Sequence, residues 1–69
     1  SMIQEDCSVL GEVTDSTLLK GARVDSGAVV KNCLIGEGAI IEKDVQLTNV
    51  VVGHRKVVSA GHIQTEGTI

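Results

Sequence analysis

Few side chains in this 69-residue sequence could carry out chemistry. His54 and His62 are its two histidines, and histidine is the usual general base near neutral pH. Arg55 and Lys56 follow His54 directly, so three basic side chains are consecutive and could together contact an anion. Two cysteines and two histidines at these spacings match no zinc-binding pattern. We therefore predict no metal ion and no cofactor, and we assign no catalytic residue.

The elements that position these side chains are expected to be β-strands. Hydrophobic residues make up 42% of the chain, mostly Val, Ile, Leu and Ala, while Trp, Tyr, Phe and Pro are absent. This fraction is too high for a disordered chain, and the abundance of β-branched residues disfavours a helical bundle. A chain of this length forms at most one small domain, whose core must consist of aliphatic and small side chains.

Charge and hydropathy exclude several classes of partner. The formal net charge is -3, with six basic residues scattered among nine acidic ones and no aromatic side chain to stack on a base, so nucleic acid and anionic lipid are not expected partners. No apolar run approaches the roughly 20 residues of a membrane-spanning helix, and no signal peptide is recognisable. We expect a cytoplasmic location. Residues 1–2 resemble a tag scar and a cloning methionine, so the natural protein could extend upstream.

An apolar repeat runs through the whole chain. Aliphatic or small apolar residues recur in steps of 6 and 5, and three successive steps of 6, 6 and 5 sum to 17. These residues are Cys7, Val13, Leu18, Val24, Val30, Ile35, Ile41, Leu47, Val52 and Val58. A three-step cycle of this kind predicts a three-sided prism that completes one coil with every cycle. Stacked coils would align inward residues in columns at the strand spacing of roughly 4.8 Å, for example Cys7, Val24, Ile41 and Val58.

Small residues and turn formers also recur at fixed places in the coil. Ala22 and Ala39 follow core residues by four positions and are expected to point into the narrow prism. Residues at the corners must adopt positive φ angles, which Gly, Asn and Asp tolerate best. The expected corner residues are Gly21, Gly27, Gly38, Asp44 and Gly61, with a second set at Asp15, Asn32 and Asn49.

The segment His54-Arg55-Lys56 breaks this pattern. Arg55 stands where Gly or Asp is expected, and Lys56 stands where the small inward residue is expected. A narrow prism cannot easily bury an unpaired ammonium group. Either the last coil is loose at this point, or Lys56 turns outward and forms a small cationic cluster with His54 and Arg55.

The pattern resembles a known family of repeats. Ile35-Gly36-Glu37-Gly38-Ala39-Ile40 is similar to the hexapeptide repeat of left-handed parallel β-helices, and the left-handed sense is implied by this resemblance. The run from Asp15 to Gly53 resembles the C-terminal β-helix of sugar-nucleotide pyrophosphorylases, most closely glucose-1-phosphate adenylyltransferases and their glycogen-biosynthesis relatives. The expected fold is thus an all-β, single-stranded left-handed parallel β-helix of about four coils, each of roughly 17 residues. We expect it to span residues 3–63, followed by a C-terminal tail at residues 64–69.

The resemblance implies a structural and oligomerisation domain rather than a complete enzyme. The parent protein would be a sugar 1-phosphate nucleotidylyltransferase whose N-terminal catalytic domain is absent from this chain and would be a partner of it. Anionic effectors bind near the β-helix in such enzymes, so His54, Arg55 and Lys56 are candidates for an effector contact. A homo-oligomer, dimer or trimer, is expected because the coil ends leave strand edges unpaired and apolar residues face outward. These outward residues are Val9, Leu10, Leu19, Val29, Ile40 and Val57.

Two alternatives remain open at this stage. One is a truncated hexapeptide-repeat acyltransferase, in which His54 or His62 would serve as the base, although four coils without an inserted loop provide no donor cleft. The other is a free-standing scaffold without an enzymatic parent. Cys7 and Cys33 fall on different sides of the expected prism, so no disulfide is predicted.

Overall fold

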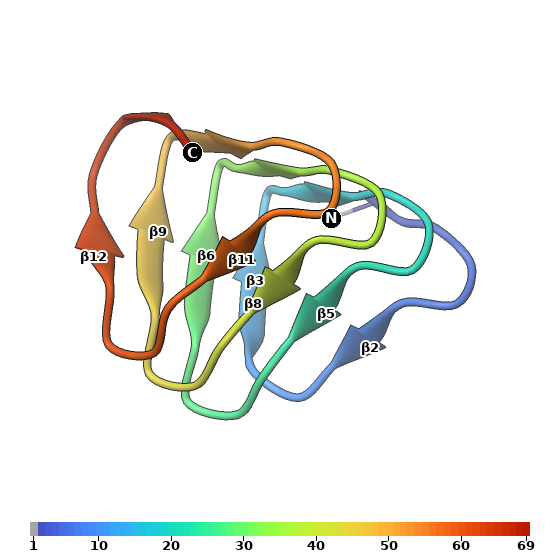
Figure 1. Ribbon diagram of the computed structural model, residues 1–69, viewed down its shortest axis with the longest axis horizontal. Coiled ribbons are helices and arrows are strands. Elements are labelled where there is room, and N and C mark those ends of the chain that lie inside the picture. The colour runs from blue at the N-terminus through green and yellow to red at the C-terminus, as the bar shows by residue number, and fades with distance from the viewer. Residues whose placement is uncertain (1) are drawn as a thin grey trace.

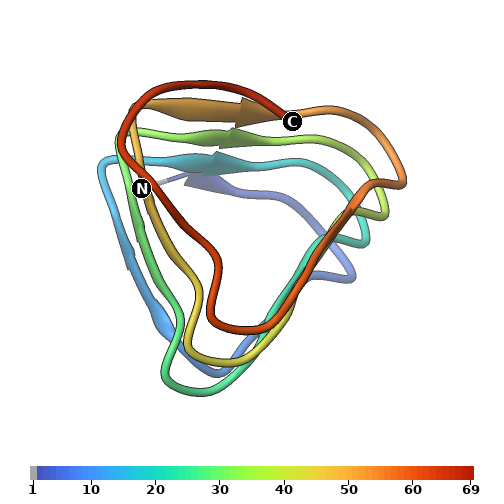
Figure 2. The ribbon, with the colours of Figure 1, turned by 60° about the vertical axis from the view of Figure 1, so that its left-hand side comes forward.

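The computed structural model describes residues 2–69, which wind into a three-sided prism of parallel strands (Figure 2). Side A contains, in stacking order, β1 (Met2–Ile3), β4 (Thr17–Leu18), β7 (Leu34–Ile35), β10 (Val50–Val52) and β13 (Gly67–Thr68). Side B contains β2 (Ser8–Val9), β5 (Arg23–Val24), β8 (Ile40–Ile41) and β11 (Val57–Val58). Side C contains β3 (Glu12–Thr14), β6 (Val29–Lys31), β9 (Gln46–Thr48) and β12 (Ile63–Gln64).

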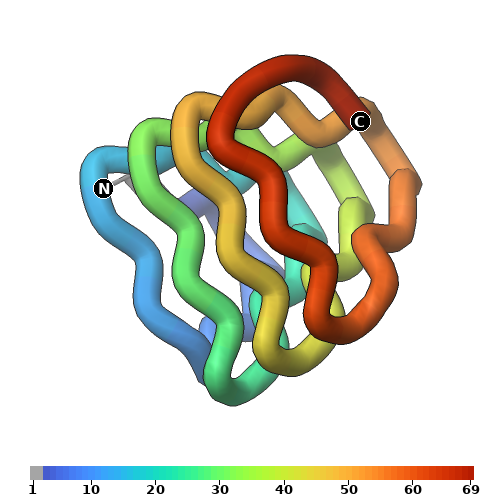
Figure 3. The backbone as a smooth tube through the Cα atoms, turned by 90° about the vertical axis from the view of Figure 1, so that its left-hand side faces the viewer, coloured from blue at the N-terminus to red at the C-terminus, as the bar shows by residue number. Residues whose placement is uncertain are grey.

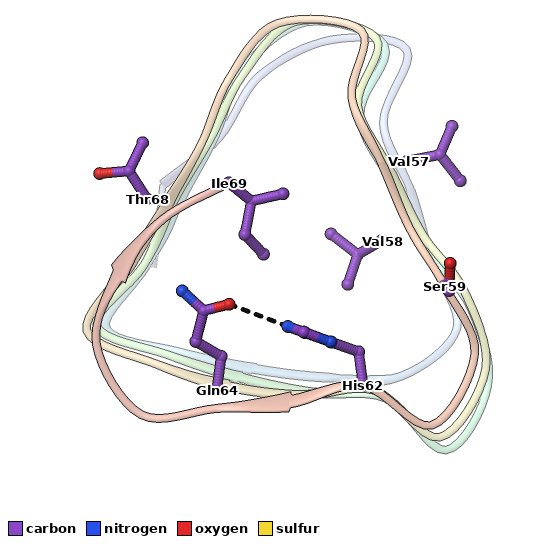
Figure 4. A pocket seen from close by; sticks show the side chains of 7 residues that line it. All are labelled: Val57, Val58, Ser59, His62, Gln64, Thr68 and Ile69. Atoms are coloured by element: carbon purple, nitrogen blue, oxygen red, sulfur yellow. Dashed lines mark hydrogen bonds between the residues drawn. The ribbon is translucent and has the colours of Figure 1, made fainter.

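The coils stack side by side, so strands far apart in the sequence are neighbours in space (Figures 1 and 3). Thr17 pairs with Leu34, and Leu34 pairs with Val51, so each strand lies against the strand one coil further along the chain. In Figure 4 the chain passes Val58, His62 and Gln64 clockwise while the coils come toward the viewer, which is a left-handed winding. The predicted all-β, left-handed parallel β-helix of about four coils is thus confirmed.

The first coil is shorter than the others by two residues. Ser8 pairs with Arg23 and Val9 with Val24, a shift of 15, whereas Glu12 pairs with Val29 at the regular shift of 17. The expected place of Cys7 in the column of Val24 is therefore wrong. Val9 takes that place and packs against the core, although it was expected to face outward.

Gly11 explains how the short turn of the first coil closes. A methyl group on Gly11 would lie 2.5 Å from the carbonyl oxygen of Ala28 and 2.6 Å from that of Asp25. Such distances are far below van der Waals contact, so only a residue without a side chain fits here. The register of the first coil thus depends on a close backbone approach that the spacing of apolar residues does not reveal.

The core consists mostly of the expected inward residues, together with Val45 and Val50, which the repeat did not identify. Ala22 and Ala39 are fully buried, which confirms their predicted orientation. The largest fully buried side chains are Leu18, Ile35, Ile41, Leu47, Val24, Val30, Val45, Val50 and Val52. Cys33 is also buried and stacks in the column of Ser16, whose hydroxyl accepts a hydrogen bond from the Cys33 backbone N–H at 3.0 Å. Cys7 and Cys33 are free thiols.

The corners adopt positive φ angles, as predicted. The glycines with φ between 66° and 77° are Gly21, Gly27, Gly38 and Gly61. The other predicted corners, Asp15, Asn32, Asp44 and Asn49, have φ between 48° and 59°. Asp6 and Arg55 also adopt this conformation. Arg55 therefore keeps the turn geometry of the repeat even though its side chain is unfavourable for it.

Residues 64–69 belong to the prism, so their assignment to a separate tail is wrong. β13 pairs in parallel with β10, and Ile69 makes two backbone hydrogen bonds with its neighbours. The Ile69 N–H donates to the Val51 carbonyl at 2.8 Å, and the Gly53 N–H donates to the Ile69 carbonyl at 3.0 Å. Residues 2–69 form no helix that is long and apolar enough to span a membrane.

Candidate functional site

The C-terminal end of the prism carries the candidate residues. Gly53 and the residues after it form the last coil, which has no further coil stacked on it among the described residues. The interior of this coil opens as a hollow of about 310 Å³ (Figure 4). Its lining residues are Val57, Val58, Ser59, His62, Gln64, Thr68 and Ile69.

Three inward positions change from apolar to polar in this coil. By the regular register of the stack, Lys56 takes the place of Ala39, His62 that of Val45, and Gln64 that of Leu47. Val45 and Leu47 are fully buried in the coil below, whereas His62 is exposed and Gln64 is half-buried. The last coil therefore has polar side chains at inward positions that remain in contact with water.

His62 and Gln64 lie beside each other on one side of the hollow and are joined by a hydrogen bond. The His62 Nε2 lies 2.8 Å from the Gln64 Oε1, and the Gln64 amide nitrogen donates to the Glu66 carbonyl at 3.0 Å. Because the amide oxygen can only accept, Nε2 is the donor in the hydrogen bond between the two side chains. Figure 4 shows both side chains pointing into the interior, beside Val58 and Ile69.

The corner formed by His54, Arg55 and Lys56 is ordered. The Arg55 N–H donates to the Glu37 carbonyl at 2.8 Å, and the Lys56 carbonyl accepts from the Ile40 N–H at 2.8 Å. The last coil is therefore not loose at this point. All three side chains are exposed, and the three residues lie between β10 and β11.

One of these three groups already has a partner. The His54 Nδ1 accepts a hydrogen bond from the backbone N–H of Glu37 at 2.9 Å, which leaves only Nε2 for a ligand. Arg55 and Lys56 are exposed to solvent and keep their charged groups available. The contact of these residues with an effector anion stays a prediction. Residues 2–69 contain no group of three or more His, Cys, Asp or Glu side chains arranged to hold a metal ion.

The N-terminal end of the prism is acidic, in contrast to the basic residues His54, Arg55 and Lys56 near the C-terminal end. Residues 2–19 contain four carboxylates and no Lys or Arg: Glu5, Asp6, Glu12 and Asp15. Ile3 is 49% exposed there and Leu10 is 64% exposed. The sequence already shows this difference in charge, since its first basic residue is Lys20. Only the stacking of the coils shows that the acidic residues gather at one end of the prism.

Comparisons with known proteins agree with this architecture. A family described as GlmU-like, C-terminal hexapeptide matches residues 1–65. The chain is 36% identical over 63 residues to glucose-1-phosphate adenylyltransferase of Bacillus cytotoxicus, and 35% identical over 63 residues to the enzymes of Bacillus thuringiensis and Bacillus mycoides. The aligned segment covers 91% of this chain but only 17% of each relative. No solved structure matches the chain.

The family match covers residues 1–65 and the aligned segment covers 91% of the chain, so both include nearly all of the coils. The resemblance that the hexapeptide pattern indicated is therefore confirmed. The chain belongs to the GlmU-like C-terminal hexapeptide family, and it is similar to the C-terminal part of glucose-1-phosphate adenylyltransferase.

Proposed function

We propose that this chain is the C-terminal β-helix domain of a cytoplasmic sugar-nucleotide pyrophosphorylase and serves in its structure and assembly. The observation that carries this proposal is the 36% identity to glucose-1-phosphate adenylyltransferase over 91% of the chain. The parent enzyme would transfer a nucleotide from a nucleoside triphosphate to a sugar 1-phosphate, as in glycogen biosynthesis. Its catalytic domain would lie outside these 69 residues.

The surroundings of the two histidines support a structural role over an acyltransferase role. A general base is usually oriented and made more basic by a carboxylate on its second nitrogen. His54 instead accepts a backbone N–H, and His62 donates to the amide of Gln64. Neither ring has a carboxylate partner among the hydrogen bonds of the described residues, so neither histidine is made more basic in this way.

The outer surface supports an assembly role. On side A, Leu34 and Val51 are neighbours on β7 and β10 and are 41% and 44% exposed. On side B, Ile40 and Val57 are neighbours on β8 and β11 and are also exposed. Adjacent exposed aliphatic residues of this kind are suited to a contact with another domain or subunit. The catalytic domain or a neighbouring subunit is the proposed partner.

A chimera tests the proposal. In the Bacillus cytotoxicus enzyme, the segment that aligns with this chain would be replaced by residues 2–69, and both synthesis of the sugar nucleotide and assembly mass would be measured. We expect the chimera to keep the mass of the relative and at least about a tenth of its activity, whereas deletion of the segment abolishes both.

The matched control is the same chimera with Ala39→Phe, which should unfold the β-helix and behave like the deletion. A chimera whose β-helix is folded by circular dichroism but which recovers neither assembly nor activity would contradict the proposal. Acetyl transfer from acetyl coenzyme A by the isolated chain, lost in His62→Ala or His54→Ala, would instead support the acyltransferase alternative.

A further inference from the structure

Side A differs from the other two sides of the prism in the charge of its strands. None of its five strands contains a charged residue, whereas side B carries Arg23 on β5, and side C carries Glu12 on β3 and Lys31 on β6. Near the middle of side A, Leu34 and Val51 pair with each other on β7 and β10, and both side chains are exposed. In the part of the chain that the structure describes, side A is therefore the uncharged face.

This face does not depend on where the described residues begin or end. Its middle is formed by β4, β7 and β10, and each of them pairs with a strand of side A on both of its edges. Thr17 on β4 and Thr68 on β13 continue the outward column of Leu34 and Val51. A sheet face with adjacent aliphatic residues and neutral neighbours is suited to packing against a second sheet about 10 Å away.

We propose that side A is the contact between two copies of this chain, related by a two-fold axis that lies in the contact and runs parallel to the prism axis. The inference rests on the proposed assembly role and specifies its surface and its partner. This symmetry places each strand of side A opposite the same strand of the second copy, running in the opposite direction. Leu34 then packs beside Leu34 of the second copy, and Val51 packs beside Val51.

The area of side A is adequate for a stable dimer. The accessible surface of the chain is 3945 Å² in total. A prism with three sides and two ends has five faces, so one side offers on the order of 800 Å², which is about what each partner buries in a stable interface. Leu34 and Val51 lie near the centre of this face, where side chains are most completely removed from water. A second copy therefore covers the exposed aliphatic residues of side A without any change in the fold.

Charges at the two edges of side A favour a second copy as the occupant. Asp15 stands at the corner before β4 and Lys20 at the corner after it, and both side chains are exposed. The two-fold axis brings the corner before β4 of one copy opposite the corner after β4 of the other. Asp15 of each copy therefore faces Lys20 of the other, which gives two pairs of opposite charge. A surface that complements itself in this way fits a contact between identical chains.

The next two coils bring no like charges together at these edges. Asn32, which precedes β7, faces Glu37, which follows β7. Asn49, which precedes β10, faces Arg55, which follows β10. At three consecutive levels, the facing corners thus present either opposite charges or one charge and one neutral amide. The edges of side A are therefore compatible with the contact along the whole middle of the face.

A two-fold axis along the strands fits less well, because it brings the same corner of both copies together. Such an axis keeps Leu34 opposite an aliphatic residue only if it passes through β7 or between β7 and β10. Through β7, Glu37 faces Glu37 of the other copy and Lys20 faces Arg55. Between β7 and β10, Asp15 faces Glu66. Like charges meet in both cases, so apolar packing and charge together favour the axis parallel to the prism.

The first test is the mass of the 69-residue chain in solution. Light scattering coupled to size exclusion, at hundreds of micromolar, should give twice 7.2 kDa, because a contact around a two-fold axis closes with two copies. The mass should not rise further with concentration. A monomer under these conditions, or a mass of three or more copies, overturns the inference.

A substitution at the centre of side A tests the surface. Leu34→Lys places two ammonium groups beside each other across the axis and should weaken the dimer at least about tenfold. The matched control is Ile40→Lys, which makes the same change at an exposed aliphatic residue on side B and should leave the dimer unchanged. Circular dichroism verifies that both variants are folded. Equal weakening by the two variants, or none by Leu34→Lys, contradicts a contact through side A.

Charge exchange tests the direction of the axis. Asp15→Arg and Lys20→Glu should each weaken the dimer about fivefold at low salt, because like charges then meet at both edges of the contact. The double variant with both changes should recover most of the parent affinity, since the introduced arginine faces the introduced glutamate of the other copy. Arg55 shows that arginine is accepted at a corner with the positive φ angle of Asp15.

Recovery in the double variant cannot come from a pair inside one chain. Asp15 and Lys20 stand at opposite ends of β4, about 16 Å apart along an extended segment. A two-fold axis along the strands does not bring Asp15 opposite Lys20, so it predicts no recovery either. A double variant that dimerises as weakly as the single variants contradicts the proposed axis.

The chimera described above separates this inference from the proposed function. If the isolated chain is monomeric while the chimera keeps the mass and activity of the relative, the proposed function stands and the contact through side A is wrong. If Leu34→Lys then inactivates the chimera, side A belongs to the catalytic domain, which also overturns a second copy as its occupant. A chain that dimerises as expected beside a chimera that fails supports the contact and contradicts the proposed function.

Discussion

At the N-terminal end of the prism the inward positions Cys7, Gly11 and Val13 are small or aliphatic, whereas at the C-terminal end the same three columns hold Lys56, His62 and Gln64. In the coils between them these columns are apolar and fully buried, as Ala22 and Ala39 are. An inward position in this fold therefore requires an apolar side chain only where a further coil covers it. The physical reason is that a polar group loses its hydration, at a cost in free energy, only where the next coil removes it from water.

The largest effect is expected from one substitution made in two coils of a single column. Ala39→Phe places an aromatic ring where no space exists, and it should destabilise the chain by more than about 3 kcal/mol or prevent folding. Lys56→Phe places the same ring at the open end and should change stability by less than about 1 kcal/mol. Urea unfolding followed by circular dichroism measures both. Equal effects would show that the C-terminal end is closed.

A second comparison uses glycines near opposite ends. Gly11→Ala would push a methyl group into two backbone carbonyls and should cost about 3 kcal/mol, at the upper end of overpacking effects. A methyl group on Gly61 meets no atom within 4 Å, so Gly61→Ala should cost only the positive φ angle, about 1 kcal/mol. Thermal unfolding of the two variants checks the order. If Gly61→Ala is the more damaging change, the short turn of the first coil has been placed incorrectly.

The polar end can also be converted into a continuation of the core. Gln64→Leu restores the aliphatic column of Val30 and Leu47, and it should stabilise the chain by about 1 kcal/mol through added apolar contact with Leu47. The loss of the hydrogen bond to His62 offsets part of this gain. Leu47→Gln, the reverse change one coil below, should destabilise strongly. A destabilising Gln64→Leu would mean that the hydrogen bonds of Gln64 with His62 and Glu66 outweigh packing there.

The smallest effect is expected at the basic corner. His54→Ala removes the acceptor of the Glu37 N–H and should cost about 0.5 kcal/mol, because the bond is exposed to water. Hydrogen exchange of the Glu37 amide, followed by NMR, should become faster in this variant. Lys56→Ala is the control and should leave that exchange rate unchanged. Unchanged exchange in His54→Ala would show that the imidazole does not hold this bond.

The regular coils were predictable because their signal is local and repeated. A narrow prism accepts only certain side chains at each inward place, so Leu18, Ile35 and Val52 recur once per coil and reveal its length. The first coil was not predictable in this way. Cys7 continues the apolar spacing as well as Val9 does, and only the close passage of Gly11 over Ala28 decides between them.

The candidate site was predictable in composition but not in arrangement. The sequence identifies His54, Arg55 and Lys56 as a basic run that departs from the repeat, and the structure keeps them on one exposed corner. It does not reveal that His54 accepts the Glu37 N–H, because this partner lies in the preceding coil.

The sequence by itself determined the length of the coil, the inward residues of the regular coils and the corners that need positive φ angles, because steric limits in a narrow prism act on each residue type separately. Only the tertiary structure decided the register of the first coil, the inclusion of residues 64–69 in the prism and the polar character of its open end. These features depend on which backbone lies above or below a residue, and a pairing between coils is a property of the stack as a whole.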